Sequence, residues 1–172
     1  MIQGHFGILF AAALGCNVTA ISHSESKKAA AEELGATRFI ATHSGKEDDF
    51  KPYIRSLDLI ILSSNDPSMP MDGYLSLLRP GGKIIAVGLP EKPLPQIQPF
   101  SLVANNVMLG GSCICSPDKI QEMLELAAKQ KITPWIEKRD LETEVNQTVI
   151  DMDEGKARFR YVLVNQKNGG KM

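Results

Sequence analysis

The sequence predicts an α/β fold with a doubly wound parallel sheet. The first observation is a β-branched strand at residues 18–22, which lies between two helix-like segments at residues 6–14 and 27–34. The second is that each helical segment ends at a glycine, Gly15 or Gly35, and glycine favours the positive φ of a helix C-terminus. Helices of about ten residues between short apolar strands imply right-handed crossovers and parallel pairing.

The same alternation continues to residue 112. The Arg-Pro-Gly-Gly run at residues 79–82 predicts a tight turn, because proline and glycine have the φ values that turns need. The prolines between residues 90 and 99 predict an extended loop, since proline removes a backbone donor. The further elements expected are strands at residues 38–41, 57–62, 83–88 and 107–112, helices at residues 71–78 and 100–105, and an acidic loop or short helix at residues 45–50.

The pattern of predicted helices and strands changes near Ser116, where we place a domain boundary. Residues 117–130 predict an amphipathic helix whose apolar face comprises Ile120, Met123, Leu124 and Ala127. Two strands, at residues 135–137 and 158–164, and a helix at residues 141–152 are expected after it, but the βαβ alternation is expected to have ended. The predicted units are residues 1–116, a return segment at residues 117–165 and a loose tail at residues 166–172.

Composition and charge restrict the classes of function. A net charge of −1 gives no electrostatic basis for binding nucleic acid or an anionic membrane. No apolar run approaches the length of a membrane span, and the N-terminus lacks the layout of a signal peptide. Cys16, Cys113 and Cys115 suit a reducing compartment, and their spacing does not suggest a zinc site. We therefore expect a cytoplasmic protein that binds neither nucleic acid nor membrane.

The turn after the first strand carries the clearest indication of a ligand. In dinucleotide-binding sheets the residue at the end of this strand meets the adenosine ribose, and a carboxylate there accepts a hydrogen bond from the 2′-hydroxyl. Here Ser22 occupies that position and Lys27 follows one turn later. Hydroxyls and a lysine would hold a 2′-phosphate that a carboxylate would repel. The alternative is a solvated turn that Ser24 or Ser26 caps.

Two further segments fit the same kind of site. Gly4 opens the apolar helix, and a glycine there lets a helix N-terminus approach a diphosphate closely, although a plain helix start explains it as well. Ser63, Ser64 and Asn65 follow the strand at residues 57–62, at the carboxyl end where parallel sheets bind ligands. The alternative is that these three residues simply end the strand.

Taken together, these motifs resemble the carboxyl-terminal half of a zinc-type medium-chain alcohol dehydrogenase of the NADP-dependent cinnamyl-alcohol-dehydrogenase type. The resemblance covers residues 4–164 and rests on the order and spacing of the motifs. They are Gly4-His5, Ser22-His23-Ser24 with Lys27, Leu34-Gly35-Ala36, Leu78-Arg79-Pro80-Gly81-Gly82, Val87-Gly88-Leu89-Pro90, Gly110-Gly111-Ser112 and Gly155-Lys156-Ala157-Arg158-Phe159-Arg160. The resemblance implies a Rossmann sheet that lacks its first strand, followed by a segment that normally packs on a catalytic domain.

The resemblance also implies a set of residues that bind NADP. The chain departs from the family at His23, where arginine is common and where phosphate binding would depend on pH, and at Cys115, where glycine is usual. The implied contacts are Gly4 and Arg160 (with Arg158 as the alternative) to the diphosphate, Ser22, His23, Ser24 and Lys27 to the 2′-phosphate, Ser64 and Asn65 to the ribose, Gly88, Leu89 and Pro90 to the nicotinamide, and Ser112 and Ile114 to its carboxamide.

The resemblance further implies that zinc and the cofactor are bound by different domains of the enzyme. Members of the family bind catalytic zinc through cysteine and histidine ligands of an amino-terminal domain, so zinc is expected in the full-length family and not in this chain. No catalytic residue and no metal ligand are therefore predicted, and the chain alone is expected to be inactive towards an alcohol or aldehyde. The alternatives are a non-catalytic nucleotide-binding or scaffold module and a methyltransferase-like domain, in which a Leu-Arg-Pro-Gly-Gly run also occurs.

A homodimer is expected through the last strand of the sheet. This stretch begins at Val107 and ends at Ser112, and no charged residue lies between residues 101 and 116. Members of the family pair through this edge, and an uncharged edge exposes backbone groups that invite a partner strand. Aggregation is the competing outcome, because a sheet without its first strand would expose apolar surface.

Overall fold

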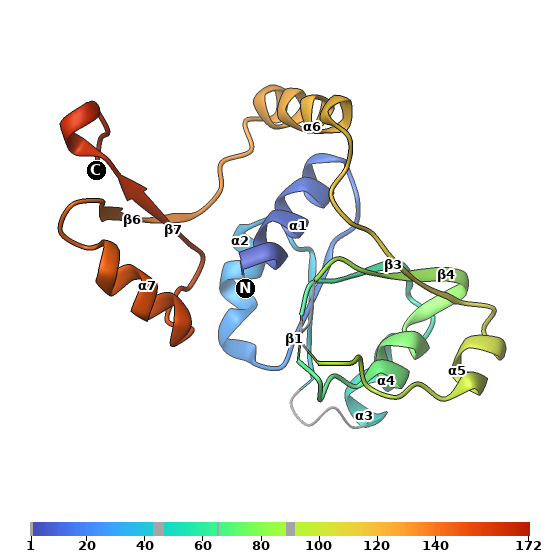
Figure 1. Ribbon diagram of the computed structural model, residues 1–172. Helices are drawn as coiled ribbons and strands as arrows, with labels where there is room; N and C mark the ends of the chain where they lie inside the picture. Colours follow the sequence, from blue (N-terminus) through green and yellow to red (C-terminus); the bar gives the residue numbers. More distant parts are fainter. Residues whose placement is uncertain (1, 43–46, 65, 89–91) are drawn as a thin grey trace.

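The chain forms three small parallel sheets with helices packed beside them (Figure 1). The computed structural model describes residues 2–42, 47–64, 66–88 and 92–172. The strands are β1 (Thr19–Ser22) with β2 (Arg38–Ala41), β3 (Leu57–Leu62) with β4 (Leu78–Ala86) and β5 (Met108–Gly111), and β6 (Ile136–Asp140) with β7 (Arg160–Val164). The helices are α1 (Ile2–Ala13), η1 (Glu25–Lys27), α2 (Lys28–Glu33), α3 (Glu47–Phe50), η2 (Lys51–Tyr53), α4 (Met71–Ser76), α5 (Pro99–Val103), α6 (Pro117–Gln130), α7 (Val145–Asp153) and η3 (Gln166–Asn168). Every strand pair is parallel, so the predicted α/β class is confirmed.

The first sheet is covered by α1 and α2. Val18 and Ala31 are buried between them, and Gly35 has a φ of +110° at the end of α2. A Cβ at Gly35 would lie 2.9 Å from the Cβ of Ala12, so glycine also permits the close approach of α1. The helix α1 begins at Ile2, earlier than predicted, and Gly4 therefore lies inside its first turn.

The main core lies on one face of the second sheet. Ile84 of β4 is fully buried, as are Leu75, Leu77 and Leu78 at the junction of α4 and β4. On the opposite face of β3, Leu59 is 53% and Ile61 is 50% exposed. Neighbouring strand residues point to opposite faces, so the helices α3 and α4 cover one face and leave these side chains of the other face open.

The predicted turn at residues 79–82 lies inside β4. Leu57 is opposite Leu78, but Leu59 is opposite Lys83, so four residues of β4 face Asp58 alone. The carboxylate of Asp58 accepts a hydrogen bond from Nη1 of Arg79 at 3.0 Å across this interruption. The structure therefore replaces the predicted turn with an irregularity of β4, and parallel pairing is present on both sides of it.

The first two sheets share a core without sharing a backbone ladder. No strand pairing joins β1 to β3 within the part of the chain that the structure describes. The side chain of Ile21 from β1 nevertheless packs against the core of the second sheet, together with the buried Ile40 of β2. The described parts of these two sheets are thus joined by side-chain packing.

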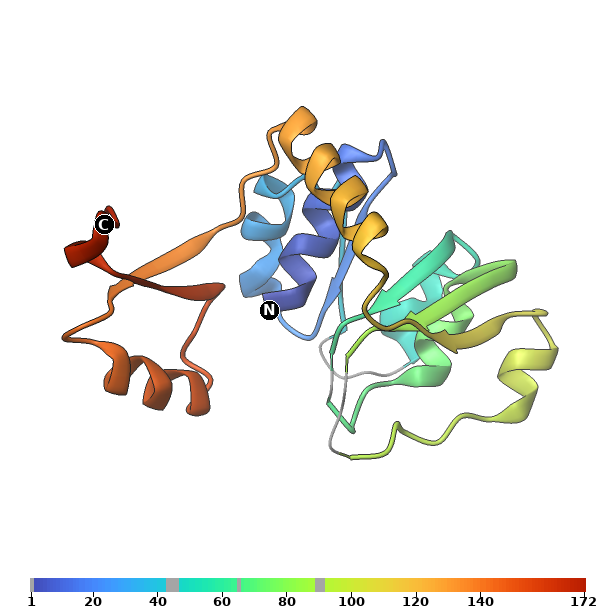
Figure 2. The same cartoon turned by 45° about the horizontal axis from the view of Figure 1, so that its top comes forward.

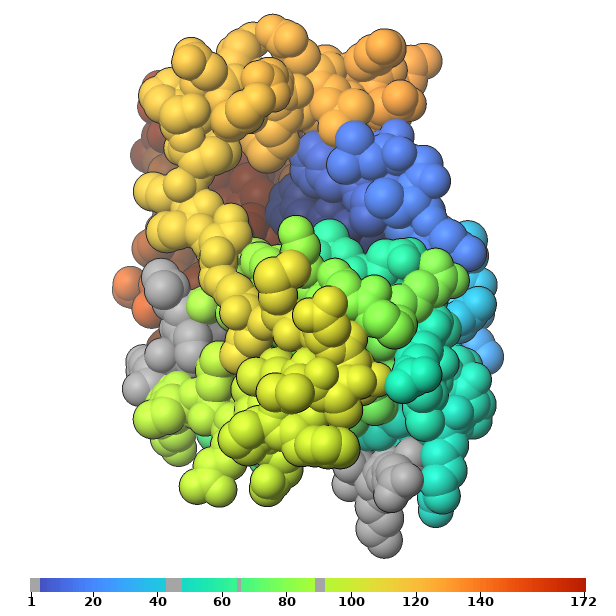
Figure 3. Space-filling view, turned by 90° about the vertical axis from the view of Figure 1, so that its right-hand side faces the viewer, coloured from blue at the N-terminus to red at the C-terminus, as the bar shows by residue number. Residues whose placement is uncertain are grey.

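The helix α6 has the predicted bounds, but its apolar face is not buried. Ile120 and Met123 are each 43% exposed, and Leu124 is 53% exposed. Figures 1 and 2 show α6 lying beside α1, and in Figure 3 the connection from β5 to α6 crosses a hollow between the sheet and the helix. The amphipathic pattern thus predicted the helix correctly.

The return segment forms its own βαβ unit, which corrects the expectation that this alternation ends before it. The parallel strands β6 and β7 are joined through α7. The sequence of β6, Ile-Glu-Lys-Arg-Asp, is too polar to suggest a full strand. Its last residue, Asp140, ends the strand by accepting hydrogen bonds from the backbone N–H groups of Glu142 (3.0 Å) and Thr143 (2.9 Å).

We predict that Gly73→Ala destabilises the protein and that Gly7→Ala does not. A Cβ on Gly73 of α4 would lie 2.7 and 2.8 Å from two ring atoms of Phe50, which is only 1% exposed and has no room to move. Gly7 lies in α1, where a Cβ would meet nothing within 4 Å. Both changes gain about 0.5–1 kcal/mol of helix propensity, so the difference between the variants measures the clash, which we expect to be about 1–3 kcal/mol. Urea unfolding of both variants gives this difference, and equal midpoints would contradict it.

Candidate nucleotide-binding site

The carboxyl ends of β3, β4 and β5 form one edge of the second sheet. Leu62, Ala86 and Gly111 are aligned in register, and the ladder continues because the N–H of Ser112 donates to the carbonyl of Ala86 at 3.0 Å. Three residues predicted to bind the cofactor, Ser64, Gly88 and Ser112, lie within two residues of this row. The structure therefore brings them to the same edge, where parallel sheets bind their ligands.

The carboxyl end of β1 meets this edge. Ser22 is partly buried, and its carbonyl accepts the N–H of Thr42 at 2.8 Å. His23 is exposed and lies close enough to Asp66, beyond β3, to act on its charge. Hydrogen bonds from the hydroxyl and the N–H of Ser68, followed by the nearby imidazole of His23, hold the pKa of Asp66 below its usual value.

This contact adds an acid to the site that the sequence did not reveal. The carboxylate of Asp66 would repel an anion that approached this end of β1. The separation of His23 and Asp66 in the chain hid the contact from sequence analysis. Lys27 lies further along the turn.

The turn itself is capped by Ser24. The hydroxyl of Ser24 accepts the N–H of Ser26 at 3.2 Å, and the two hydroxyl oxygens are 2.9 Å apart. Capping by Ser24 was the simpler of the two interpretations of this turn, and the structure shows it. The cap fixes the direction in which η1 presents Lys27.

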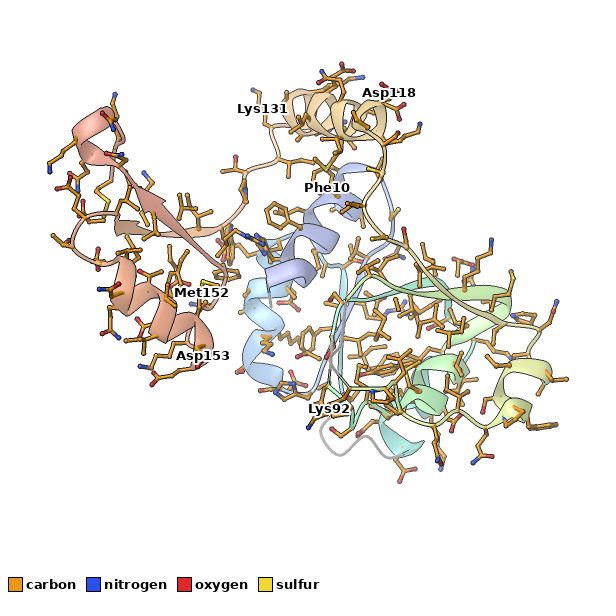
Figure 4. The ribbon with its side chains drawn as sticks, in the orientation of Figure 1. Phe10, Lys92, Asp118, Lys131, Met152 and Asp153 are labelled. Carbon is orange, nitrogen blue, oxygen red and sulfur yellow. The ribbon has the colours of Figure 1, made fainter. Side chains whose placement is uncertain are left out.

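A cavity of about 330 Å³ lies between this turn and the return segment. One wall comes from η1 and α2, and the other comes from the turn that leads from α7 to β7. Figure 4 shows Met152 and Asp153 at the end of α7, just before this turn. The lining residues are Ser26, Lys27, Ala30, Gly155, Ala157 and Arg158. Arg158, the alternative to Arg160 in the sequence analysis, is thus the arginine that lines the cavity.

An aromatic cluster fixes the second wall to α1. The ring of Phe159 packs edge-on against His5 of α1, with 5.5 Å between ring centroids, and against Trp135, with 4.9 Å. The carboxylate of Glu137 accepts the backbone N–H groups of Arg158 at 3.0 Å and of Phe159 at 3.2 Å. His5 and Phe159 are both buried, so these contacts hold the residues next to the cavity in place.

An ion-pair network orders the turn that carries Gly155. Lys156 lies 3.3 Å from Asp151 and 2.5 Å from Glu154, and Arg139 lies 3.5 Å from Asp151. The hydrogen bond from Gln147, together with Lys156 and Arg139, lowers the pKa of Asp151. Lys156 is therefore paired with carboxylates and, unlike Lys27 and Arg158, does not line the cavity.

The structure says less about the other residues that were predicted to bind the cofactor. Ile114 is 94% exposed in the connection to α6, and Arg160 is exposed at the start of β7. Gly4 is partly exposed within α1. Asn65, Leu89 and Pro90 lie outside the described residues.

The described residues contain no cluster of histidine, cysteine and carboxylate side chains that could hold a metal ion. Cys16, Cys113 and Cys115 are free and exposed. None of the described helices has the length and apolar character needed to span a bilayer. Among the described residues, the groups at this edge of the sheet are hydroxyls, backbone groups, cations and the carboxylate of Asp66.

Parallel strands whose carboxyl ends meet at one edge, next to a turn that carries cations, are the arrangement of a nucleotide-binding α/β domain. Residues 4–129 match the sequence profile of the zinc-binding dehydrogenase family, which is well over half of the chain. The protein belongs to this family. Membership excludes the methyltransferase-like alternative, and it confirms the resemblance on which the expected cofactor site rests.

The chain is similar to several dehydrogenases in sequence. It is 41% identical to a probable cinnamyl alcohol dehydrogenase 3 of Oryza sativa subsp. japonica over 161 residues, which cover 93% of this chain and 43% of that protein. It is 38% identical to the 8-hydroxygeraniol dehydrogenase of Catharanthus roseus, with 93% of this chain and 43% of that protein covered. The chain therefore spans less than half the length of these relatives.

Solved structures give the same result. A cinnamyl alcohol dehydrogenase of Sorghum bicolor superposes with a TM-score of 0.84 at 29% identity, over 98% of this chain and 46% of that chain. The cinnamyl alcohol dehydrogenase of Helicobacter pylori in complex with NADP(H) superposes with a TM-score of 0.74 at 30% identity, over 94% of this chain and 45% of that chain. The similarity again covers about half of each enzyme.

We predict that Asp151→Asn destabilises the return segment near neutral pH. The native pKa of Asp151 lies below the ordinary value of 3.8, so its stabilisation is present above that pH and is lost as the pH falls through the lowered pKa. The melting temperatures of parent and variant should therefore differ at pH 7 and converge below about pH 4. Asp153→Asn, on the same helix but without an ion pair among the described contacts, is the control. A difference that persists at low pH would contradict the assignment.

Proposed function

We propose that this chain binds NADP(H) as the cofactor-holding part of a zinc-dependent alcohol dehydrogenase. The observation that carries the proposal is the β1 turn, which offers Ser22, Ser24 and Lys27 where a carboxylate would select NAD. A phosphate group fits this donor set, because hydroxyls and ammonium groups donate to it and no acid occupies the position of Ser22. The Helicobacter pylori relative with NADP(H) supports the same choice.

The roles of the site residues follow from their places at the sheet edge. Gly88 has no side chain, so a planar ring could approach the backbone beyond β4. When bound, the nicotinamide supplies the hydride or accepts it. We assign Gly4 and Arg160 to the diphosphate, Ser22, His23, Ser24 and Lys27 to the 2′-phosphate, Ser64 and Asn65 to the ribose, Gly88, Leu89 and Pro90 to the nicotinamide, and Ser112 and Ile114 to the carboxamide.

The other parts of the reaction belong to the whole enzyme. We propose that an alcohol or aldehyde is the substrate, and that a zinc ion held outside these 172 residues polarises its oxygen. We assign no catalytic residue to this chain. We also propose a cytoplasmic location, since three exposed free thiols suit a reducing compartment.

The division into three units remains a proposal as well. The separate β6–α7–β7 sheet supports a boundary near Ser116, with residues 1–116 as the NADP-binding domain and residues 117–165 as the return segment. In the proposed tail, residues 166–172, Asn165 caps η3, and Lys167 pairs with Glu142 at 2.6 Å.

We predict that the chain prefers NADP to NAD and that Lys27→Ala removes most of this preference. One charge-assisted hydrogen bond is worth about 1.5–3 kcal/mol, so NADP affinity should fall about 10- to 100-fold while NAD affinity stays the same. Lys28→Ala is the matched control, because Lys28 carries the same charge on the next residue and does not line the cavity. Fluorescence titration of both cofactors provides the measurement. Equal affinities of the parent chain for NADP and NAD would refute the proposal.

We also propose a homodimer through the edge strand β5. All four residues of β5 are exposed, and Met108 is 51% exposed at the end of the strand order β3-β4-β5. Phe100 and Val103 of α5 are 78% and 77% exposed beside it. An uncovered apolar edge of this kind favours pairing with a second copy.

We predict that Met108→Lys converts the dimer to a monomer, because a charge on the pairing edge opposes strand addition. Leu59→Lys places the same charge on β3, the opposite edge strand of the sheet, and should leave the dimer intact. Light scattering separates the outcomes. If Leu59→Lys relieves aggregation and Met108→Lys does not, the chains associate through the open side of β3. A monomeric parent chain would exclude both the β5 dimer and this association.

A further inference from the structure

We propose that Cys113 and Cys115 form a redox-active dithiol, which a small disulfide such as glutathione disulfide converts to an intrachain disulfide. The two residues lie on either side of Ile114 in the connection between β5 and α6. Both thiols are free and exposed, and the attack of a thiolate on a small disulfide requires such access. This modification site is separate from the proposed function and does not depend on it.

The spacing of the two cysteines permits a disulfide. Cα atoms two residues apart in a chain are separated by at most about 7 Å, because each residue spans about 3.3–3.6 Å when fully extended. Disulfides join Cα atoms that are about 4.4–6.8 Å apart. A modest bend of the backbone at Ile114 is therefore sufficient to bring the two sulfur atoms together.

The backbone around the two cysteines is free to make this bend. The N–H of Ser112 donates to the carbonyl of Ala86 at 3.0 Å, and α6 begins only at Pro117. Between them, residues 113–115 make no backbone hydrogen bond with another described residue. Ile114 is 94% exposed, so the bend disrupts little packing. The connection runs past the hollow beside α6 in Figure 3, where no ladder restrains it.

The reaction is a thiol–disulfide exchange in two steps. In the first step, the thiolate of one cysteine attacks glutathione disulfide, and a mixed disulfide forms as one glutathione thiolate leaves. In the second step, the other thiolate attacks the protein sulfur of the mixed disulfide and displaces the second glutathione. In total, the two protein thiols lose two protons and two electrons, and glutathione disulfide gains them to become two molecules of glutathione.

The second step is fast relative to its competitors because the attacking thiol is tethered. A short flexible tether gives an effective concentration on the order of millimolar, which exceeds the concentration of free glutathione in a micromolar solution. The ring that closes around Ile114 is small, and strained or exposed disulfides are readily reduced. The disulfide should therefore form and break as the surrounding thiols change.

Cys16 provides a control within the same chain. It is free and exposed like the other two cysteines, but it lies in the connection between α1 and β1 with no second cysteine near it in the sequence. A mixed disulfide at Cys16 therefore has no tethered thiol two residues away to displace its glutathione. Its expected product is a persistent mixed disulfide.

The test is to treat the 172-residue chain with glutathione disulfide, block the remaining thiols with iodoacetamide and map the products by mass spectrometry. We expect Cys16 to carry glutathione. The peptide that contains both Cys113 and Cys115 should have lost two hydrogen atoms and should carry neither glutathione nor the alkyl group. Dithiothreitol should restore both thiols.

Single variants show whether each cysteine needs the other. In Cys113→Ser and in Cys115→Ser, the remaining cysteine should keep its glutathione at a level about tenfold or more above that of the parent peptide, because the tethered thiol is absent. Cys16→Ser should leave the result at the pair unchanged. Glutathione retained on the pair in the parent chain, or alkylation of both cysteines, would overturn the proposal. A disulfide from the pair to Cys16 or to a second copy, which peptide mapping and a non-reducing gel reveal, would overturn it too.

Discussion

The packing of Phe159 between His5 and Trp135 is the contact on which the arrangement of the site depends. It is made by residues from opposite ends of the chain, and it buries Phe159 to 6% exposure. Aromatic pairs in this geometry contribute about 0.5–1.5 kcal/mol beyond the area that they bury. This contact joins the return segment to α1 next to the turn at Gly155. The cavity exists because this cluster brings the two walls together.

A second constraint is the absence of a ladder between β1 and β3 in the described chain. The two sheets keep their relative position through side chains, such as Ile21 and Tyr74, which pack against the core of the second sheet. Side-chain packing of this kind lacks the register that backbone hydrogen bonds impose. It nevertheless brings the carboxyl end of β1 near the carboxyl end of β3, as the interaction of His23 with Asp66 shows.

The electrostatics of the site follow from which charges already have partners. Asp151, Glu154 and Glu137 are engaged by side chains or by backbone groups of the return segment. His23 faces Asp66, whereas Lys27 and Arg158 face the cavity. The same charged residues would give the site a different preference for anions if their ion-pair partners were exchanged.

The sequence by itself determined the α/β class, the bounds of β2, β3 and α6, and the cationic character of the β1 turn. Each of these depends on local chemistry: alternation of apolar and polar residues, glycine at helix ends, and the residue type at Ser22. Tertiary structure decided the rest. The polar strand β6 becomes a strand only because β7 pairs with it, and the apolar face of α6 stays exposed because no described element covers it. Arg158 reaches the cavity, and Asp66 reaches His23, through contacts between residues far apart in the chain. Such contacts are fixed by packing and leave no local pattern in the sequence, so only the folded chain reveals them.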